Sequence, residues 1–182
     1  IIGVMVRARE LIDEGRSTLF FVNTRETAEW LAARYHLWEE DIPIEVHHGS
    51  LSRDTRVDTE DRFKRGELKA LVCTSSLELG IDIGSADLVL QYNSPREVSR
   101  MIQRAGRAGH RIGEKIRSVI LATAPDEVAE AMVIARRADA KELEYRPGRR
   151  DPLSVLANQL VAMTMVGRVT REEVLDTVRR SN

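Results

Sequence analysis

The sequence contains few cysteines and aromatic residues and no long hydrophobic run. Cys73 is the one cysteine among 182 residues, which excludes an internal disulfide and a cysteine metal cluster. No stretch approaches the ~18 apolar residues that a membrane span needs, and the first residues lack the basic region and cleavage site of a signal peptide. We therefore expect a cytoplasmic protein with no membrane-bound part.

A charge excess of one sign is also absent. The sequence has 28 Lys and Arg against 29 Asp and Glu, for a formal net charge of −1. Nucleic-acid binding would therefore have to come from a local patch. Charged residues at 31% and hydrophobic residues at 42% describe a soluble globular protein and exclude disordered and fibrous classes. The length suits about one domain with a short appendage.

Short apolar segments alternate with helical patterns along most of the chain. The apolar segments predict buried strands at 18–22, 44–47, 70–73, 88–92 and 118–121. The spacing of apolar residues predicts helices at 7–14, 25–38, 53–65, 95–105 and 125–140. Such alternation implies right-handed crossovers. We therefore predict an α/β fold with a doubly wound parallel sheet.

Pro, Gly and charged residues interrupt this pattern at residues 145–152. We place a domain boundary there, with a first domain at 1–146 and a helical segment at 147–182. An apolar stripe from Leu153 to Thr164 predicts one helix, and a capping box at Thr170–Glu173 opens another. The chain begins without Met and ends just after a helical pattern, so we expect it to be a piece of a longer protein.

Candidate binding residues follow the predicted strands, where doubly wound folds bind ligands. The segments 23–25, 48–52, 74–82 and 103–111 are rich in hydroxyl groups, glycines and cations, which bind phosphate. Residues 96–117 carry seven Arg or Lys against two acids. One interpretation is a solvated arginine face. The other is that Gly106 and Gly109 place Arg107 on a loop, where its guanidinium would stabilise a transferring phosphoryl group.

Other candidate residues have ordinary structural explanations. His47 and His48 are adjacent on a strand and point to opposite faces, and no further ligand has suitable spacing, so we predict no metal site. Asp82 could cap a turn, and Thr74 could be a strand-forming residue. Cys73 reads as a core residue. No aromatic residue interleaves with the basic run, so any nucleic acid would be bound by its backbone, independently of base sequence.

Several segments resemble motifs of superfamily 2 helicases, in the family's order. Residues 103–110, Gln-Arg-Ala-Gly-Arg-Ala-Gly-His, resemble motif VI, residues 73–82 resemble motif V, and residues 18–28 resemble the motif IV region. His47-His48-Gly49-Ser50-Leu51 resembles the segment between motifs IV and V. The amino-acid sequence of residues 74–84 is most similar to that of the large helicase-related (Lhr) family of bacteria and archaea. The tail from Pro152 resembles the opening of that family's winged-helix region.

The resemblance implies that this chain is the second of two RecA-like motor domains and lines one side of the cleft between them. Arg107 would be the arginine finger on the γ-phosphate, and Gln103 would order the nucleotide or attacking water. Arg104 is a further nucleotide-side candidate, and Gly80 and Asp82 would line the cleft. Many superfamily 2 helicases have an arginine where this chain has His110, so either Arg111 takes that role or one finger suffices. Contacts to strand phosphates would come from Thr74, Asn23, Thr24, His48, Gly49 and Ser50.

The sequence contains no Gly-x-x-x-x-Gly-Lys-Ser/Thr loop and no Asp-Glu-x-His or Asp-Glu-x-Asp motif. ATP and Mg²⁺ would therefore be bound mainly by a first RecA-like domain outside this chain, and this chain alone should be inactive. The resemblance implies an ATP-driven helicase or translocase on single-stranded DNA, with 3′ to 5′ polarity. An RNA or RNA–DNA helicase stays open, as does an α/β module that binds nucleic acid without hydrolysis.

Overall fold

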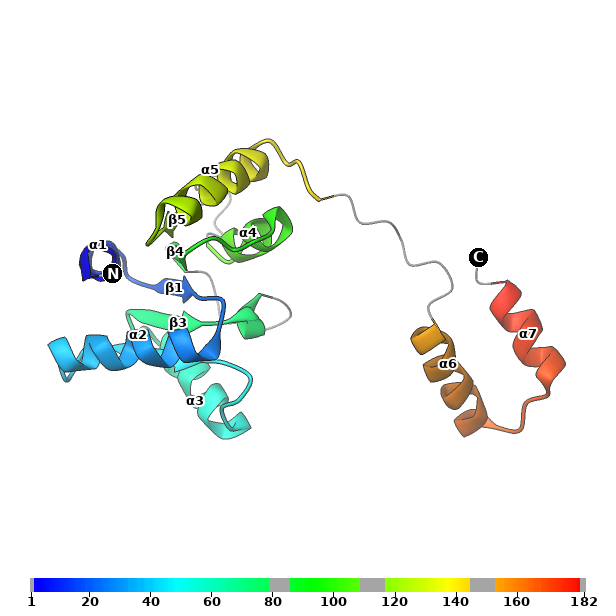
Figure 1. Ribbon diagram of the computed structural model, residues 1–182. Coiled ribbons are helices and arrows are strands. Elements are labelled where there is room, and N and C mark those ends of the chain that lie inside the picture. Colours follow the sequence, from blue (N-terminus) through cyan, green and yellow to red (C-terminus); the bar gives the residue numbers. More distant parts are fainter. Residues whose placement is uncertain (1, 79–85, 109–116, 145–152, 181–182) are drawn as a thin grey trace. The chain divides into compact units, whose positions relative to one another are not determined.

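A five-stranded parallel sheet forms the centre of the first part of the chain (Figure 1). The computed structural model describes residues 2–78, 86–108, 117–144 and 153–180. The strands are β1 (Thr18–Phe21), β2 (Ile44–His47), β3 (Ala70–Cys73), β4 (Leu88–Tyr92) and β5 (Ser118–Leu121). Their order is β2-β3-β1-β4-β5, and every neighbouring pair is parallel. The predicted α/β class with a doubly wound parallel sheet is confirmed.

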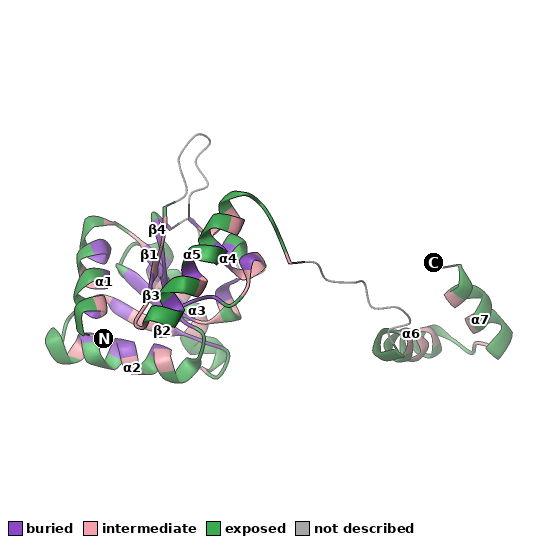
Figure 2. Cartoon of the chain, turned by 45° about the horizontal axis from the view of Figure 1, so that its top comes forward, coloured by how far each residue is buried: buried purple, intermediate pink, exposed green. Residues whose placement is uncertain are grey.

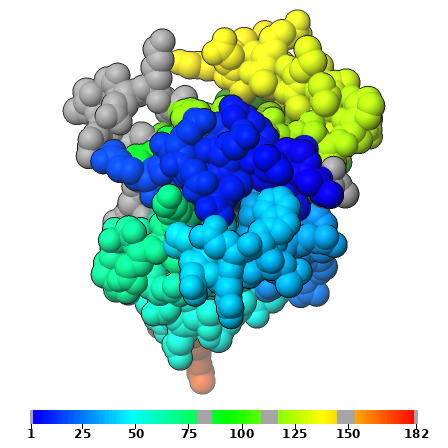
Figure 3. Space-filling model, turned by 90° about the vertical axis from the view of Figure 1, so that its left-hand side faces the viewer, coloured from blue at the N-terminus to red at the C-terminus, as the bar shows by residue number. Residues whose placement is uncertain are grey.

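Helices cover both faces of the sheet, which explains the unbroken apolar runs of the central strands (Figure 2). Phe20 packs on one face with α1 (Ile2–Glu14) and α2 (Arg25–Trp38). Leu19 and Phe21 point to the other face, toward Phe63 of α3 (Arg53–Lys64). In Figure 3 the dark blue atoms of the first residues lie between the light blue atoms of α2 and the yellow-green atoms of α5.

Two further helices pack together beside the sheet. They are α4 (Val98–Ala105) and α5 (Pro125–Asp139). Val98 and Met101 of α4 contact Ile134 of α5 in a small apolar cluster. Cys73 is completely buried in β3, and burial raises the pKa of its thiol. It is the core residue that the sequence predicted.

Several boundaries differ from the sequence predictions by one residue, and three differences are larger. Helix α1 begins at Ile2 instead of residue 7, because Met5 extends the buried stripe of Ala8 and Leu11 toward the N-terminus. Helix α4 begins at Val98 instead of residue 95, because Arg96 has a φ of +68°, which is incompatible with a helix. A short 3₁₀ helix, η1 (Ser75–Leu77), follows β3 in the predicted loop.

The chain divides into two compact units, Ile1–Glu144 and Tyr145–Asn182. In the second unit, α6 (Leu153–Val166) and α7 (Arg171–Arg179) are joined by a turn. Thr170 and Glu173 form the predicted capping box at the start of α7. Neither helix has a buried residue. Across the described part of the chain, no helix combines the length and the apolar character that a membrane crossing requires.

Candidate nucleotide and nucleic-acid interface

The carboxyl ends of three adjacent strands carry the residues predicted to contact a nucleic-acid strand. Asn23 and Thr24 follow β1, residues 48–50 follow β2, and Thr74 follows β3. These strands are neighbours in the sheet and run parallel. Their ends therefore meet at one edge, which is the edge where doubly wound sheets bind ligands. The structure brings the predicted strand contacts together there.

The loops after β1 and β2 form an exposed polar surface. Thr24 caps α2, since its Oγ1 accepts a hydrogen bond from the backbone N–H of Thr27 at 3.2 Å. Arg25 joins the two loops by donating from Nη1 to Oγ of Ser50 at 3.0 Å. The Arg25 side chain is 62% exposed, and its Nε also donates to Oε1 of Glu26 at 2.7 Å. Arg25 belongs to the predicted phosphate-binding segment 23–25, but it is not among the residues expected to contact strand phosphates.

His48 differs from its exposed neighbours Gly49 and Ser50, because its side chain is buried. Its Nε2 lies 2.7 Å from Oε1 of Glu29 on α2. The side chain therefore holds the loop after β2 against α2. The phosphate contact predicted for His48 stays a prediction.

A second histidine, His47, connects three elements beneath this edge. Its side chain is fully buried, with Nδ1 2.9 Å from Oγ of Ser76 in η1 and Nε2 2.8 Å from Oε1 of Glu60 in α3. Burial lowers the pKa of His47, and the hydrogen bond to Glu60 opposes that shift. His47 thus fixes η1 directly after Thr74, whose side chain makes no capping bond to η1. The described residues contain no group of three potential metal ligands.

One acidic residue, Glu78, binds both arginines at the end of α4. Arg104 is 1% exposed, and its Nε and Nη2 donate to Oε1 of Glu78 at 2.8 and 2.5 Å. Arg107 is half-buried in the turn after α4, and its Nη2 donates to the main-chain oxygen of Glu78 at 2.7 Å. Glu78 lies in the predicted binding segment 74–82, but no role is predicted for it from the sequence alone. Its position between Leu77 and Leu79, as an acid in an apolar stretch, was the available signal.

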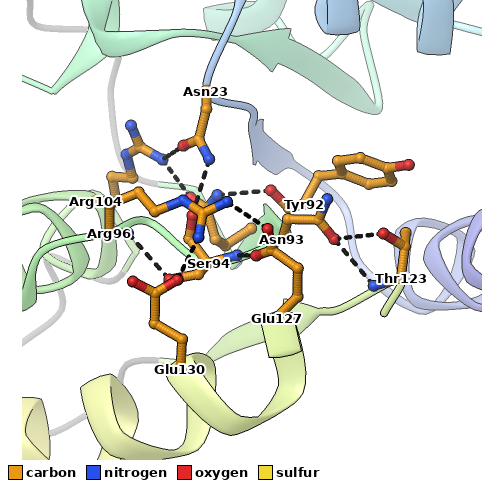
Figure 4. A network of polar contacts seen from close by, with 10 residues as sticks. Asn23, Tyr92, Asn93, Ser94, Arg96, Arg104, Thr123, Glu127 and Glu130 are labelled. Carbon is orange, nitrogen blue, oxygen red and sulfur yellow. Dashed lines mark hydrogen bonds and ion pairs between the residues drawn. The ribbon is translucent and has the colours of Figure 1, made fainter. Parts of the chain in front are cut away.

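The contacts of Arg104 extend to the loop after β1 (Figure 4). Its Nη1 donates to Oε1 of Gln91 in β4 and, at 3.4 Å, to Oδ1 of Asn23. Asn23 in turn donates from Nδ2 to the main-chain oxygen of Ser94 at 2.8 Å, and Ser94 N donates to Glu127 at 2.7 Å. A continuous polar network therefore joins α4, β4, the loop after β1, and α5.

The remaining predicted nucleotide-side residues fall in two groups. Gln103 is exposed on the last turn of α4, close to Arg107 in sequence. Gly80, Asp82, His110 and Arg111 lie outside the described residues. Helix α4 ends at Ala105, and Gly106 caps it with a φ of −62°, so this turn does not use the left-handed conformation that glycine permits.

Several cations of the basic run at 96–117 are paired with acids from other segments. Arg96 pairs with Glu127 and Glu130 of α5, and Arg117 pairs with Glu14 at 2.8 Å. With Arg104 on Glu78, three of its cations meet acids from elsewhere in the chain. The excess of basic residues at 96–117 is therefore partly balanced by acids from other segments.

The comparison with known families identifies the domain. A family profile described as the helicase conserved C-terminal domain matches residues 4–113, more than half of the chain. The chain belongs to the helicase C-terminal domain family. The matched residues include the segments 73–82 and 103–110, on which Glu78, Arg104 and Arg107 lie. The resemblance noted from those segments is confirmed.

Curated relatives of this helicase C-terminal domain include Lhr helicases. It is 43% identical to ATP-dependent helicase Lhr-Core protein 2 of Thermococcus barophilus, over 96% of this chain and 20% of that protein. It is 34% identical to the Lhr helicase/uracil glycosylase of Escherichia coli, over 91% of this chain and 13% of that protein. The chain thus spans about a fifth or less of the length of these relatives.

Solved structures show the same architecture. The structure of Mycobacterium smegmatis helicase Lhr bound to ssDNA and AMP-PNP matches 98% of this chain and 24% of that one, with a TM-score of 0.88 and 37% identity. The structure of Saccharomyces cerevisiae Dbp5 bound to RNA and ADP BeF3 matches 78% of this chain and 36% of that one, with a TM-score of 0.65 and 27% identity. The helicase C-terminal domain therefore has the RecA-like fold that the sequence predicted.

Proposed function

We propose that this chain is the second motor domain of an ATP-dependent superfamily 2 helicase or translocase that moves along single-stranded DNA. The observation that carries the proposal is the attachment of Arg107 to Glu78. It holds a guanidinium at the end of α4, beside the loop that follows β3. The names of the Lhr relatives as ATP-dependent helicases, and the ssDNA in the structure of one of them, support the proposal.

On the nucleotide side, Arg107 would reach the γ-phosphate of ATP held by the first RecA-like domain. An arginine that enters a nucleotide site in this way stabilises charge that develops during phosphoryl transfer. Gln103 lies on the neighbouring turn of α4 and would order the nucleotide or the attacking water. ATP and Mg²⁺ would be held mainly by the first domain, because this sequence has no phosphate-binding loop. The chain alone would hydrolyse no ATP.

On the strand side, exposed hydroxyl and main-chain groups would bind phosphates. The exposed residues Asn23, Thr24, Gly49 and Ser50 and the half-buried Thr74 all lie at one edge of the sheet. Hydroxyl and backbone N–H groups bind the phosphate backbone without reading the bases. Hydrolysis would open and close the cleft between the motor domains and so alternate their grip on the strand. We place this activity in the cytoplasm.

A strand-unwinding assay on the full-length protein tests this proposal. The substrates are matched DNA, RNA and RNA–DNA duplexes with single-stranded tails of either polarity. We expect ATP-dependent unwinding of tailed DNA in the 3′ to 5′ direction. Preferential unwinding of RNA duplexes, or of hybrids whose single-stranded tail is RNA, would replace single-stranded DNA by RNA as the tracked strand. ATP-independent binding without unwinding or translocation would contradict the motor assignment and favour a non-hydrolysing nucleic-acid-binding module.

A further inference from the structure

Arg104 is the largest side chain among the fully buried residues of the described structure. A guanidinium in the protein interior is unfavourable unless ion pairs and hydrogen bonds replace its hydration. Arg104 has these replacements from three different segments: Glu78 after β3, Gln91 in β4, and Asn23 after β1. The guanidinium carbon also lies 5.1 Å from the centre of the Phe21 ring. All three guanidinium nitrogens are engaged within the domain.

These contacts are unsuited to direct nucleotide binding. A phosphate would have to compete with the Glu78 carboxylate, which accepts from Nε and Nη2 in a nearly dry environment. Breaking a buried ion pair by removing one partner leaves an uncompensated charge and is strongly unfavourable. Arg104 is therefore placed to hold other groups in position instead of contacting ATP.

Two of the three hydrogen-bond partners of Arg104 belong to different sides of the proposed site, one to the nucleotide side and one to the strand side. Glu78, which binds the Arg104 side chain, also accepts from Arg107 through its main-chain oxygen. Asn23, which accepts from Arg104, is a proposed strand contact and is anchored to Ser94 by its amide group. One chain of hydrogen bonds thus runs from Arg107 through Glu78 and Arg104 to Asn23, and Figure 4 shows its Arg104–Asn23 end.

We propose that Arg104 is a positioning residue that couples the arginine finger at Arg107 to the strand contact at Asn23. The proposal rests on the proposed function, since it assigns nucleotide to one end of the chain and nucleic acid to the other. Occupation of the site around Arg107 would shift Glu78, and the rigid planar fork of Arg104 would transmit the shift to Asn23. Nucleotide binding would then change the affinity for the strand through this buried ion pair.

The test measures this coupling in the full-length protein. The dissociation constant for a fluorescent single-stranded DNA is measured with and without saturating AMP-PNP, and the ratio of the two constants reports the coupling. In coupled sites, one ligand typically changes the affinity for the other by about 5- to 150-fold. Arg104→Lys keeps a charge for Glu78 but cannot also reach Gln91 and Asn23 with a planar fork. We expect this variant to bring the ratio to within about twofold of one, with the AMP-PNP affinity of the DNA-free protein unchanged.

Two further variants separate coupling from folding. The pair Glu78→Met and Arg104→Met replaces the buried ion pair by apolar side chains, a change that often preserves stability. It should unfold at a temperature close to that of the native protein and still lose the coupling. Asn23→Ala should reduce the ratio as Arg104→Lys does, and the two changes together should add nothing, because both interrupt one chain of contacts. Arg62→Lys, in a surface ion pair with Glu45, is the matched control with a native ratio.

Three results would overturn the proposal. The first is a native ratio in Arg104→Lys. The second is a weakened AMP-PNP affinity in DNA-free Arg104→Lys with the ratio intact, which would make Arg104 a nucleotide contact. The third is additive effects of Asn23→Ala and Arg104→Lys. Failure of the proposed function gives a different result, because the native protein itself would then show neither coupling nor DNA-stimulated ATP hydrolysis.

Discussion

The guanidinium of Arg107 donates two hydrogen bonds to the main-chain oxygen of Glu78, from Nη2 at 2.7 Å and from Nε at 3.2 Å. Arg107 follows α4 and Glu78 follows η1, so the contact joins two of the segments that resemble helicase motifs. Because a main-chain oxygen is the acceptor, the contact does not depend on the acidic side chain of Glu78. That carboxylate stays available for Arg104.

Replacement of Arg107 tests its role as the arginine finger. In the full-length protein, Arg107→Ala should lower DNA-stimulated ATP turnover by about 10³-fold or more, since an arginine finger contributes 10³–10⁵ to phosphoryl transfer. Steady-state ATP hydrolysis with saturating single-stranded DNA measures this effect. Arg117→Ala, in the same basic segment but paired with Glu14 at the surface, should leave turnover unchanged. Native turnover in Arg107→Ala would refute the finger.

The proposed contacts to the nucleic-acid strand can be tested by measuring the contribution of a hydroxyl group separately from that of a cation. Thr74→Val keeps the shape of the side chain and removes its hydroxyl, so the affinity for single-stranded DNA should fall about fivefold, the effect of one net hydrogen bond. The slope of log affinity against log salt should not change, because no cation is lost. Binding titrations at several salt concentrations measure both quantities. Native affinity at every salt concentration would contradict the role of Thr74.

Arg25 should show the opposite pattern in the same titrations. Its exposed side chain is hydrogen-bonded to Ser50, so Arg25→Gln should reduce the salt slope by about 0.7, the effect of one phosphate contact on a single strand. Arg16, at the opposite end of β1, is an even more exposed arginine, and it pairs with Asp87 as Arg25 pairs with Glu26. Arg16→Gln should leave both affinity and slope unchanged. Equal slopes for native protein and Arg25→Gln would remove Arg25 from the interface.

His47 should make the stability of the domain dependent on acid. Burial lowers the pKa of His47 in the folded state, whereas in the unfolded chain it titrates near its ordinary value of about 6.5. The unfolded chain therefore binds more protons below about pH 6.5, and the free energy of unfolding should decrease as the pH falls through that range. Urea unfolding between about pH 5 and 8 measures this dependence. In His47→Gln the contribution should disappear, and an unaltered profile would contradict the assignment.

Glu144 stabilises the start of α4, the helix that carries Arg104. Its carboxylate accepts hydrogen bonds from the backbone N–H groups of Val98 and Ser99, and the bond from Val98 is the main reason that the pKa of Glu144 is lowered. Glu144→Gln should therefore lower the melting temperature at neutral pH. The native protein should lose this advantage as the pH falls through the lowered pKa of Glu144, so the two melting curves should converge in acid.

The neighbouring residue Glu142 supplies the control for Glu144. It forms only a surface contact with Arg137, at 3.7 Å. Glu142→Gln should melt close to the native temperature at every pH, because exposed ion pairs contribute little. A difference between Glu144→Gln and native protein that persists unchanged in acid would show that the effect does not arise from the carboxylate.

Much of the secondary structure follows from local patterns. The segments at 44–47, 70–73 and 118–121 become β2, β3 and β5 with the predicted boundaries. All four residues of β3 are buried, as suits a strand covered on both faces, whereas β2 and β5 at the sheet edges are partly exposed. Thr24 and Ser52 cap α2 and α3, and such a cap is local because it depends only on the next three residues. The start of α4 could not be predicted in this way, because Arg96 takes its left-handed conformation while bound to Glu127 and Glu130.

By itself, the sequence determined the strands, most helices, the order of the motifs and the resemblance to a helicase domain, because each depends on residues close together in the chain. Tertiary structure alone decided which charged residues bind other residues of the same domain. Glu78 and Arg104 are 26 residues apart, and Glu144 lies 45 and 46 residues from the groups that it caps. Such contacts form only when folding brings distant segments together, and the Glu78–Arg104 pair forms where the sheet brings its loops to one edge. There, burial strengthens each ion pair and makes an unpaired charge too costly to retain.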